Sequence, residues 1–227
     1  MLPFARNMEV AGEEKIMTST VALPETTTPS NPVLDYRPRA MTGMAYGAII
    51  MGFFGCLWLT WALASMDVRT SVVIAAVPVF AASLWIPAAG LLRKGLSASK
   101  QAAPLTPEDE REQSRMGKIF GLVFAAEGVL IFLAINVLNN LHLGDYAISA
   151  IAAIVGLHFL PLARLFRRPM YYVVGTIMTV AALASIAIPV SIRISTLSAT
   201  MSVILWITCV LITRKGFALG RELQTAG

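Results

Sequence analysis

Six apolar stretches, each long enough to cross a bilayer, constrain this chain more than any other feature of its sequence. An α-helix rises about 1.5 Å per residue, so roughly 20 apolar residues span a hydrocarbon core about 30 Å thick. In lipid only helices and closed barrels satisfy every backbone hydrogen bond, and runs this long lack the alternation of barrel strands. The sequence therefore predicts an all-α integral membrane protein with six transmembrane helices. They are expected at about residues 42–65, 71–92, 119–141, 146–164, 170–190 and 195–213.

Composition leaves little room for a soluble domain. Hydrophobic residues make up 56% of the 227 residues and charged residues 14%, whereas a soluble domain averages about 25% charged residues. We expect a six-helix membrane domain at 41–216, preceded by a disordered tail at 1–40, because residues 18–32 are rich in Thr, Ser and Pro. A polar loop at 93–118 and a C-terminal tail at 217–227 complete the predicted organisation.

Basic residues flank the predicted spans almost entirely on one side. They lie before the first span, in the loop at 93–118, in the turn at 164–168 and after the last span, whereas the other side has only Arg69 and Arg193. Basic loops stay in the cytoplasm, so we expect both tails to be cytoplasmic. The same belt is suited to anionic lipids at the cytoplasmic face, and we expect no binding of nucleic acid.

The loop at 93–118 is predicted to be partly helical. Its segment Thr106–Glu110, with the sequence TPEDE, has an N-capping residue, a proline at the first helical position and acids in the first turn. We therefore expect the third span to begin as a helix near Thr106 and to run from the cytoplasm into the bilayer.

The chain also shows signs of an internal repeat. Leu84–Ile86 precedes Arg93–Gly95 at the end of the second span, and the matching Leu205–Ile207 precedes Arg214–Gly216 at the end of the sixth. Two glycines of the first span likewise match two of the third. We interpret the chain as three tandem helical hairpins, all inserted the same way round, as in some transporter folds. The alternative is that apolar segments ending in Arg-Lys resemble one another by chance.

Two ionisable residues lie deep inside the predicted spans. Glu127 is the only acid within a span, and His158 is the only histidine deep in one. Glu127 follows Lys118 by nine residues and His158 precedes Arg167 by nine, which places both roughly 13–14 Å from the cytoplasmic surface. A very short turn joins the third and fourth spans, so these helices should be antiparallel neighbours. We therefore expect Glu127 and His158 to meet near mid-membrane.

A glutamate–histidine pair at that depth has two interpretations. A lone carboxylate at mid-bilayer costs roughly 2.5–3.5 kcal/mol on insertion scales, so it must be neutral, paired or facing water. Burial favours the neutral form of both groups and pairing favours the charged forms, and a pair near that balance could exchange protons close to neutral pH. The alternative is a buried interhelical hydrogen bond, typically worth about 0.6–2 kcal/mol.

Asn136 is a secondary candidate on the third span. It lies nine residues after Glu127, toward the outer end, and we expect it not far from the face that carries Glu127. There it would line a vestibule. Asparagine near a helix end also caps the helix, which is the simpler interpretation.

The segment Gly156–Phe166, with the sequence GLHFLPLARLF, resembles a segment of uncharacterised bacterial multi-pass membrane proteins. The resemblance covers about one span and implies no established activity. It favours His158 and Arg164 as functional positions.

The sequence gives little support for catalysis. It has no phosphate-binding glycine loop, no HExxH and no GxSxG motif. Cys56 and Cys209 both lie in spans, so neither a disulfide nor a metal site of Cys/His spacing is indicated. We expect a protein that is not an enzyme and has no cofactor or metal. His142 and Asp145 at an outer turn could form an acid–base pair, and a membrane-embedded enzyme built on them is the third-ranked hypothesis.

The leading functional hypothesis is a small transporter or channel-like protein of the plasma membrane, here a bacterial inner membrane, that is linked to protons through Glu127 and His158. The alternative is a non-catalytic scaffold, stress or partner-subunit protein in which the pair only locks two spans together. A homo-oligomer would help so small a bundle to enclose a pathway. The substrate, if there is one, is not indicated.

Overall fold

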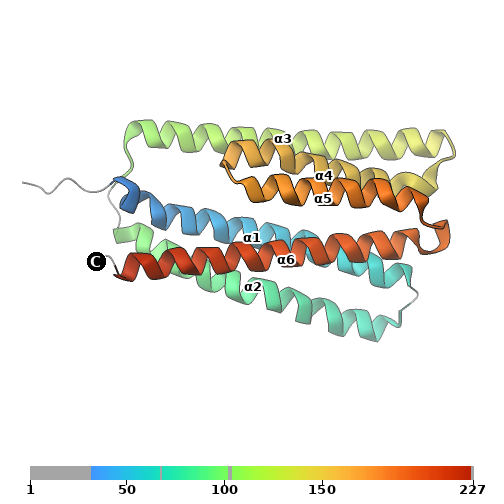
Figure 1. Cartoon of the computed structure of the whole chain (residues 1–227), viewed down its shortest axis with the longest axis horizontal. Helices are drawn as coiled ribbons and strands as arrows, with labels where there is room; N and C mark the ends of the chain where they lie inside the picture. The colour runs from blue at the N-terminus through green and yellow to red at the C-terminus, as the bar shows by residue number, and fades with distance from the viewer. Residues whose placement is uncertain (1–31, 67, 102–103, 226–227) are drawn as a thin grey trace, which may run out of the picture. The chain divides into compact units, whose positions relative to one another are not determined.

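Long apolar helices make up the part of the chain described by the computed structural model, residues 32–66, 68–101 and 104–225 (Figure 1). In this part six helices are long and apolar enough to cross a membrane, and there is no strand, which confirms the predicted all-α fold. The elements in order are α1 (Pro32–Ser65), α2 (Thr70–Gln101), α3 (Pro107–Asn140), the 3-10 helix η1 (Gly144–Tyr146), α4 (Ala147–Phe166), α5 (Pro169–Ala184), the 3-10 helix η2 (Ser185–Ala187) and α6 (Val190–Thr225).

Several helices extend beyond the predicted spans. Helix α1 begins at Pro32, so residues 32–40, which we expected to belong to the disordered tail, are helical; residues 1–31 lie outside the described part. Helix α6 continues to Thr225, through most of the predicted C-terminal tail. Hydropathy locates the apolar part of a helix, whereas the helix itself continues into water wherever no residue breaks it.

The loop at 93–118 consists mostly of helix, to a greater extent than the helical start near Thr106 that we predicted. Helix α2 continues to Gln101, and α3 begins directly after Thr106. Thr106 is the N-cap: its hydroxyl accepts a hydrogen bond from the backbone N–H of Asp109, and the Asp109 carboxylate accepts one from the Thr106 N–H. Pro107 occupies the first turn, and this reciprocal capping box confirms the predicted start of the third span.

The helices pack in two sets of three. Helix α1 makes its most extensive contacts with α6 and then with α2, while α4 lies against α5 and α3 (Figure 1). Helix α5 contacts α4 far more than it contacts α6. Contacts join α1 to α2 and α3 to α4, whereas those between α5 and α6 are few, so the predicted arrangement of three hairpins is not confirmed.

One apolar core joins the two sets. Its buried members come from α1, α2, α4, α5 and α6, and α6 supplies the most. Helix α3 is different, because Glu127 is its one buried residue in the described part. The largest fully buried side chains of this core are Leu84, Met178, Leu197, Met201 and Leu205.

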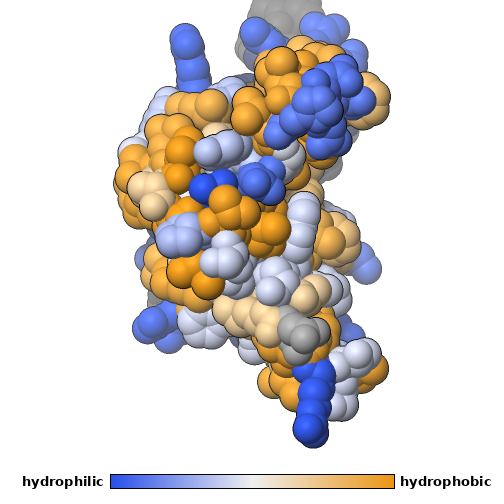
Figure 2. Space-filling view, turned by 90° about the vertical axis from the view of Figure 1, so that its right-hand side faces the viewer, coloured by the Kyte–Doolittle hydropathy of each residue, from blue (hydrophilic) through white to orange (hydrophobic). Residues whose placement is uncertain are grey.

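The two ends of the helices differ in charge. We call the end where α2 and α6 finish the basic end, because Arg93, Lys94, Arg214 and Lys215 lie there. The opposite end holds the connections between α1 and α2, α3 and α4, and α5 and α6. Figure 2 looks onto this opposite end, where hydrophilic residues are interspersed among hydrophobic ones.

Candidate functional site

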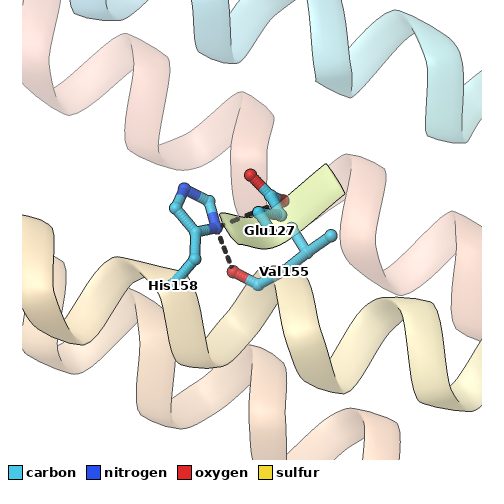
Figure 3. A network of polar contacts seen from close by, with 3 residues as sticks. All are labelled: Glu127, Val155 and His158. Carbon is cyan, nitrogen blue, oxygen red and sulfur yellow. Dashed lines mark hydrogen bonds and ion pairs between the residues drawn. The ribbon is translucent and has the colours of Figure 1, made fainter. Parts of the chain in front are cut away.

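Glu127 of α3 and His158 of α4 meet between their helices (Figure 3). The Glu127 Oε1 atom lies 3.4 Å from the His158 Nδ1 atom. The same nitrogen lies 2.6 Å from the Val155 carbonyl oxygen, three residues earlier on α4. A carbonyl can only accept a hydrogen bond, so Nδ1 carries a proton and donates it to the Val155 carbonyl, while Glu127 Oε1 lies within ion-pair distance of the same nitrogen. The Nε2 atom is then the position at which this imidazole gains or loses a proton.

The pair is enclosed by apolar groups. The side chains of Glu127 and His158 are 7% and 10% exposed. The ring centroid of Phe159 lies 4.4 Å from that of His158, and the Phe124 ring lies 5.7 Å away in an edge-on arrangement. Water therefore has little access to either ionisable group in this conformation.

Aromatic rings continue from the pair along the interface of α3 and α4. Phe120 contacts Phe124 on its own helix and Phe166 near the end of α4, with ring centroids 4.9 Å and 6.0 Å apart. Phe124 also reaches Phe54 of α1, at 6.2 Å. These rings and the Glu127–His158 contact, together with the half-buried Ile131 against the core, lie on the inner face of an otherwise exposed helix.

The secondary candidates do not join the pair. Asn136 is exposed, and its amide donates to the Phe132 carbonyl of its own helix at 2.7 Å. Nine residues are roughly two and a half helical turns, which places Asn136 on the face opposite Glu127, so the expected shared face was wrong. Arg164 is exposed near the end of α4 and lies on a different face from His158.

The outer turn does not assemble an acid–base pair. His142 and Asp145 are both exposed, and no hydrogen bond or ion pair joins their side chains in the described part of the chain. His142 has a φ of 56° and lies directly after Leu141, the C-cap of α3, at the position where a helix commonly ends in the left-handed conformation. There the backbone N–H of Leu143 bonds to the Leu138 carbonyl, which closes the helix with a Schellman motif. Nor do the described residues contain a group of three His, Cys, Asp or Glu side chains suited to a metal.

Arg193 is the residue that sequence reasoning missed. We expected it in the loop between the fifth and sixth spans, but it lies in the first turn of α6 and is 4% exposed. Its guanidinium donates to the carbonyl oxygens of Ser185, Ile186 and Ile188, at 3.0–3.2 Å. A further bond, 3.2 Å long, goes from its Nη1 to the Asp145 carbonyl.

Arg193 therefore ties two connections together at the opposite end. Asp145 lies in η1, between α3 and α4, whereas the other carbonyls belong to η2 and the residues that follow it. The guanidinium also lies 4.7 Å from the centre of the Tyr146 ring. Pro189 could have indicated this arrangement, because a proline commonly precedes or opens a helix and places the fourth residue after it within the first turn.

The comparisons with known proteins identify a family but assign no activity. A family model described as a family of unknown function, DUF7010, matches residues 35–215. The chain belongs to this family. The match includes the segment 156–166 but does not test the resemblance proposed for it. No curated protein and no solved structure matches the chain.

Proposed function

We propose that this member of the DUF7010 family is a multi-pass membrane protein without catalytic activity, a scaffold or partner subunit, in which Glu127 and His158 fasten α3 to α4. The observation that carries the proposal is the enclosure of the pair, whose side chains are 7% and 10% exposed beside Phe124 and Phe159. A carboxylate in lipid must be neutral or paired, and here its partner lies on the neighbouring helix.

Helix α3 depends on this polar contact more than the other helices do. In lipid no hydrophobic driving force holds a helix against its neighbours, so van der Waals packing and interhelical hydrogen bonds must do so. Helix α3 buries one residue, Glu127, whereas α4 and α6 bury many. A polar contact therefore contributes a larger share of the attachment for α3 than for the other helices.

A proton-linked transporter or channel-like protein is the second candidate. The Nδ1–H of His158 is held by the Val155 carbonyl, which leaves Nε2 to exchange protons with water or a carboxylate. Separation of α3 from α4 would expose both groups. In this function the structure represents the closed state of a proton pathway, and α3 is the helix that moves to open it.

Proton flux into proteoliposomes that contain a pH-sensitive dye distinguishes the two candidates. Wild type is compared with Glu127→Gln, which keeps the shape of the side chain and removes its charge. The lock predicts no flux from either protein and a lower thermal stability for the variant. Flux in the wild type that disappears in a folded Glu127→Gln protein would overturn the lock and establish the proton-linked candidate.

We also propose that both tails lie in the cytoplasm of a cell whose plasma membrane holds the protein, with anionic lipids around the basic end. The support is the near absence of basic residues at the opposite end, where Arg193 is buried and Arg69 is exposed. Single cysteines at Ser114 and Leu143, both exposed, test this with a membrane-impermeant maleimide. Leu143→Cys should react in intact cells, and Ser114→Cys only after permeabilisation.

A repeat of three hairpins, inserted the same way round, remains a proposal about the origin of the fold. Its support is the matched Leu-Trp-Ile and Arg-Lys-Gly segments of α2 and α6.

We also propose a homo-oligomer that forms through the exposed apolar surface of α3. The mass of the purified protein in detergent would test it.

A further inference from the structure

One face of α3 consists of small residues. They recur at intervals of three or four along the helix, so they lie on one side of it, and all of them are exposed. They are Ser114, Gly117, Gly121, Ala125 and Gly128. A Cβ atom on any of these three glycines would have nothing within 4 Å, whereas one on Gly156 or Gly175 would meet the backbone of the helix packed against it. This small face of α3 suits close contact with another helix, and the described part of the chain places none there.

A groove between α1 and α2 has a shape that accepts a helix. It has a volume of about 780 Å³ and is lined by mostly apolar side chains, between Phe53 and Thr60 on α1 and between Val77 and Ala89 on α2. At about 1.5 Å per residue the α2 wall is roughly 18 Å long, and the small face, from Gly117 to Gly128, is roughly 17 Å long. Helices α2 and α3 lie at opposite edges of the described helices (Figure 1), so the small face and the groove of one chain do not meet.

The small face and the groove lie at the same depth in the membrane. Trp85 of α2 packs against Gly52 of α1. Phe54 of α1 contacts Phe124 of α3, with ring centroids 6.2 Å apart. Counted from these contacts along helices of equal rise, residues 117–128 of α3 match the depth of about residues 79–90 of α2, and the groove wall covers almost the same interval. Copies related by rotation about the membrane normal keep each residue at its depth, so the two surfaces can meet without a shift.

Charges of opposite sign flank the two surfaces at the basic end. Glu110 is exposed one turn before Ser114, on the small face. On α2, Arg93 and Lys100 lie four and eleven residues beyond Ala89, on the side of the helix that lines the groove, and both are exposed. By the same count, Glu110 matches the depth of about residue 97 of α2, between the two cations. The two surfaces are therefore complementary in charge as well as in length and depth.

We propose that the small face of α3 in one copy of the protein lies in the α1–α2 groove of a second copy, with Glu110 beside Arg93 and Lys100 of that copy. The inference rests on the homo-oligomer proposed above and names the two surfaces that form it. Because the surfaces differ, the contact is heterologous, and each copy keeps one groove or one small face for a further copy. Glycine and alanine let the two backbones approach closely, and such packing drives helix association in lipid. The ion pairs fix the orientation of the two copies.

Disulfide cross-linking between two differently tagged copies tests the contact. Both copies lack the native thiols through Cys56→Ala and Cys209→Ala. One copy carries Ala125→Cys on the small face, and the other carries Ala82→Cys in the groove, at the matching depth. After co-expression the membranes are oxidised with copper phenanthroline. We expect a covalent dimer that contains both tags, and no dimer when either variant is expressed alone.

A cysteine at the wrong depth is the matched control. Ile74 is exposed on α2, eight residues or roughly 12 Å farther from the basic end than Ala82, so Ile74→Cys should give no mixed dimer with Ala125→Cys. Equal yields from the two α2 positions would overturn the proposal, as would a dimer of Ala125→Cys copies with one another, in which two small faces meet. An oligomeric mass in detergent without the mixed cross-link would overturn this contact and keep the homo-oligomer. A monomeric mass without the cross-link would overturn both.

Further substitutions separate shape from charge. Gly121→Leu fills the small face at a position that is open in the single chain, so it should lower the yield of mixed dimer by about tenfold and leave the protein folded. Ala126→Leu adds bulk at an exposed position on another side of α3 and should leave the yield unchanged. Glu110→Lys should lower the yield by about two- to fivefold, and Lys100→Glu in the other copy should restore it. Thermal unfolding confirms that each variant is folded. Equal yields from the Gly121→Leu and Ala126→Leu proteins would overturn the proposal.

Discussion

Arg193 and Glu127 are both buried ionisable residues of a membrane protein, but their surroundings differ. Arg193 donates to several backbone carbonyls from two connections and faces the Tyr146 ring. Glu127 has one partner across its helix interface, His158, at 3.4 Å. Arg193 sits where several helices end and leave carbonyls without partners, whereas Glu127 sits in the middle of a regular helix.

The difference shows two ways to keep a polar group inside a membrane fold. The partners of Arg193 are main-chain carbonyls, which no substitution can remove, so they lose a donor whenever the arginine is replaced. The partner of Glu127 is a side chain, so both members can be replaced together by apolar residues. We therefore regard Arg193 as a structural residue. The Glu127–His158 pair is an adjustable contact, because both of its members can change together, and it is the better candidate for a functional site.

The largest effect is expected from Arg193→Met. This change removes the arginine donor from the carbonyls of Ile188 and Asp145 and leaves the Ser185 carbonyl with only the backbone N–H of Ile188, and we expect a loss of roughly 3 kcal/mol or more of stability. Thermal unfolding in detergent, followed by size-exclusion chromatography, measures it. Arg69→Met is the matched control, because Arg69 is an exposed basic residue at the same end. Equal stability of the two variants would remove the structural role assigned to Arg193.

A somewhat smaller loss is expected where α4 and α5 approach most closely. A Cβ atom on Gly175 would lie 2.7 Å from the Gly156 carbonyl oxygen, which is backbone and cannot rotate away. We expect Gly175→Ala to cost about 1–3 kcal/mol. Gly121→Ala on α3 is the control, because nothing lies within 4 Å of its added carbon. The difference between the two variants would show that α4 and α5 approach one another at the backbone, whereas α3 has no such close approach at Gly121.

A double-mutant cycle on Glu127 and His158 measures the adjustable contact. Glu127→Leu and His158→Phe should each destabilise the protein because each leaves the other member without its partner. The double variant should be more stable than the sum predicts, with a coupling energy of about 0.6–2 kcal/mol. Chemical unfolding in mixed micelles provides the four free energies. A coupling of zero would mean that the two side chains do not stabilise one another, and the lock would fail.

The smallest effect is expected from His142→Gly. His142 holds a left-handed backbone conformation, with φ of 56°, which glycine adopts without steric cost. We expect a gain of a few tenths to about 1 kcal/mol. His142→Ala is the control, because alanine removes the imidazole and keeps the Cβ. Similar gains in both variants would attribute the effect to the ring and not to the backbone.

The comparison also shows which parts of the molecule were predictable from the chain. The six apolar helices followed from hydropathy, and the start of α3 followed from Thr106 and Pro107, because capping depends on neighbouring residues alone. Arg193 was misplaced because hydropathy treats a basic residue as a loop. Its burial depends on carbonyls that come from residues 48 positions away as well as from its own connection.

The candidate site was predictable in part for a similar reason. A short turn brings α3 and α4 together, so the meeting of Glu127 and His158 needed only helix geometry and chain direction. The enclosure of the pair by Phe124 and Phe159 depends on side-chain packing and was not predicted. Asn136 was assigned to the wrong face because its helical phase was misjudged, an error that sequence geometry alone can correct.

The sequence by itself determined that this chain consists of membrane-spanning helices, because the cost of burying backbone and charge in lipid is set by each residue and its near neighbours. Only the tertiary structure decided which helices pair when they are far apart in the sequence. Helix α6 lies against α1, across most of the chain, and the contacts that select this partner are between surfaces of similar apolar character. Hydropathy cannot distinguish such surfaces, whereas close fits such as Gly55 against Leu205 and the hydrogen bond from Ser202 to the Gly55 carbonyl can.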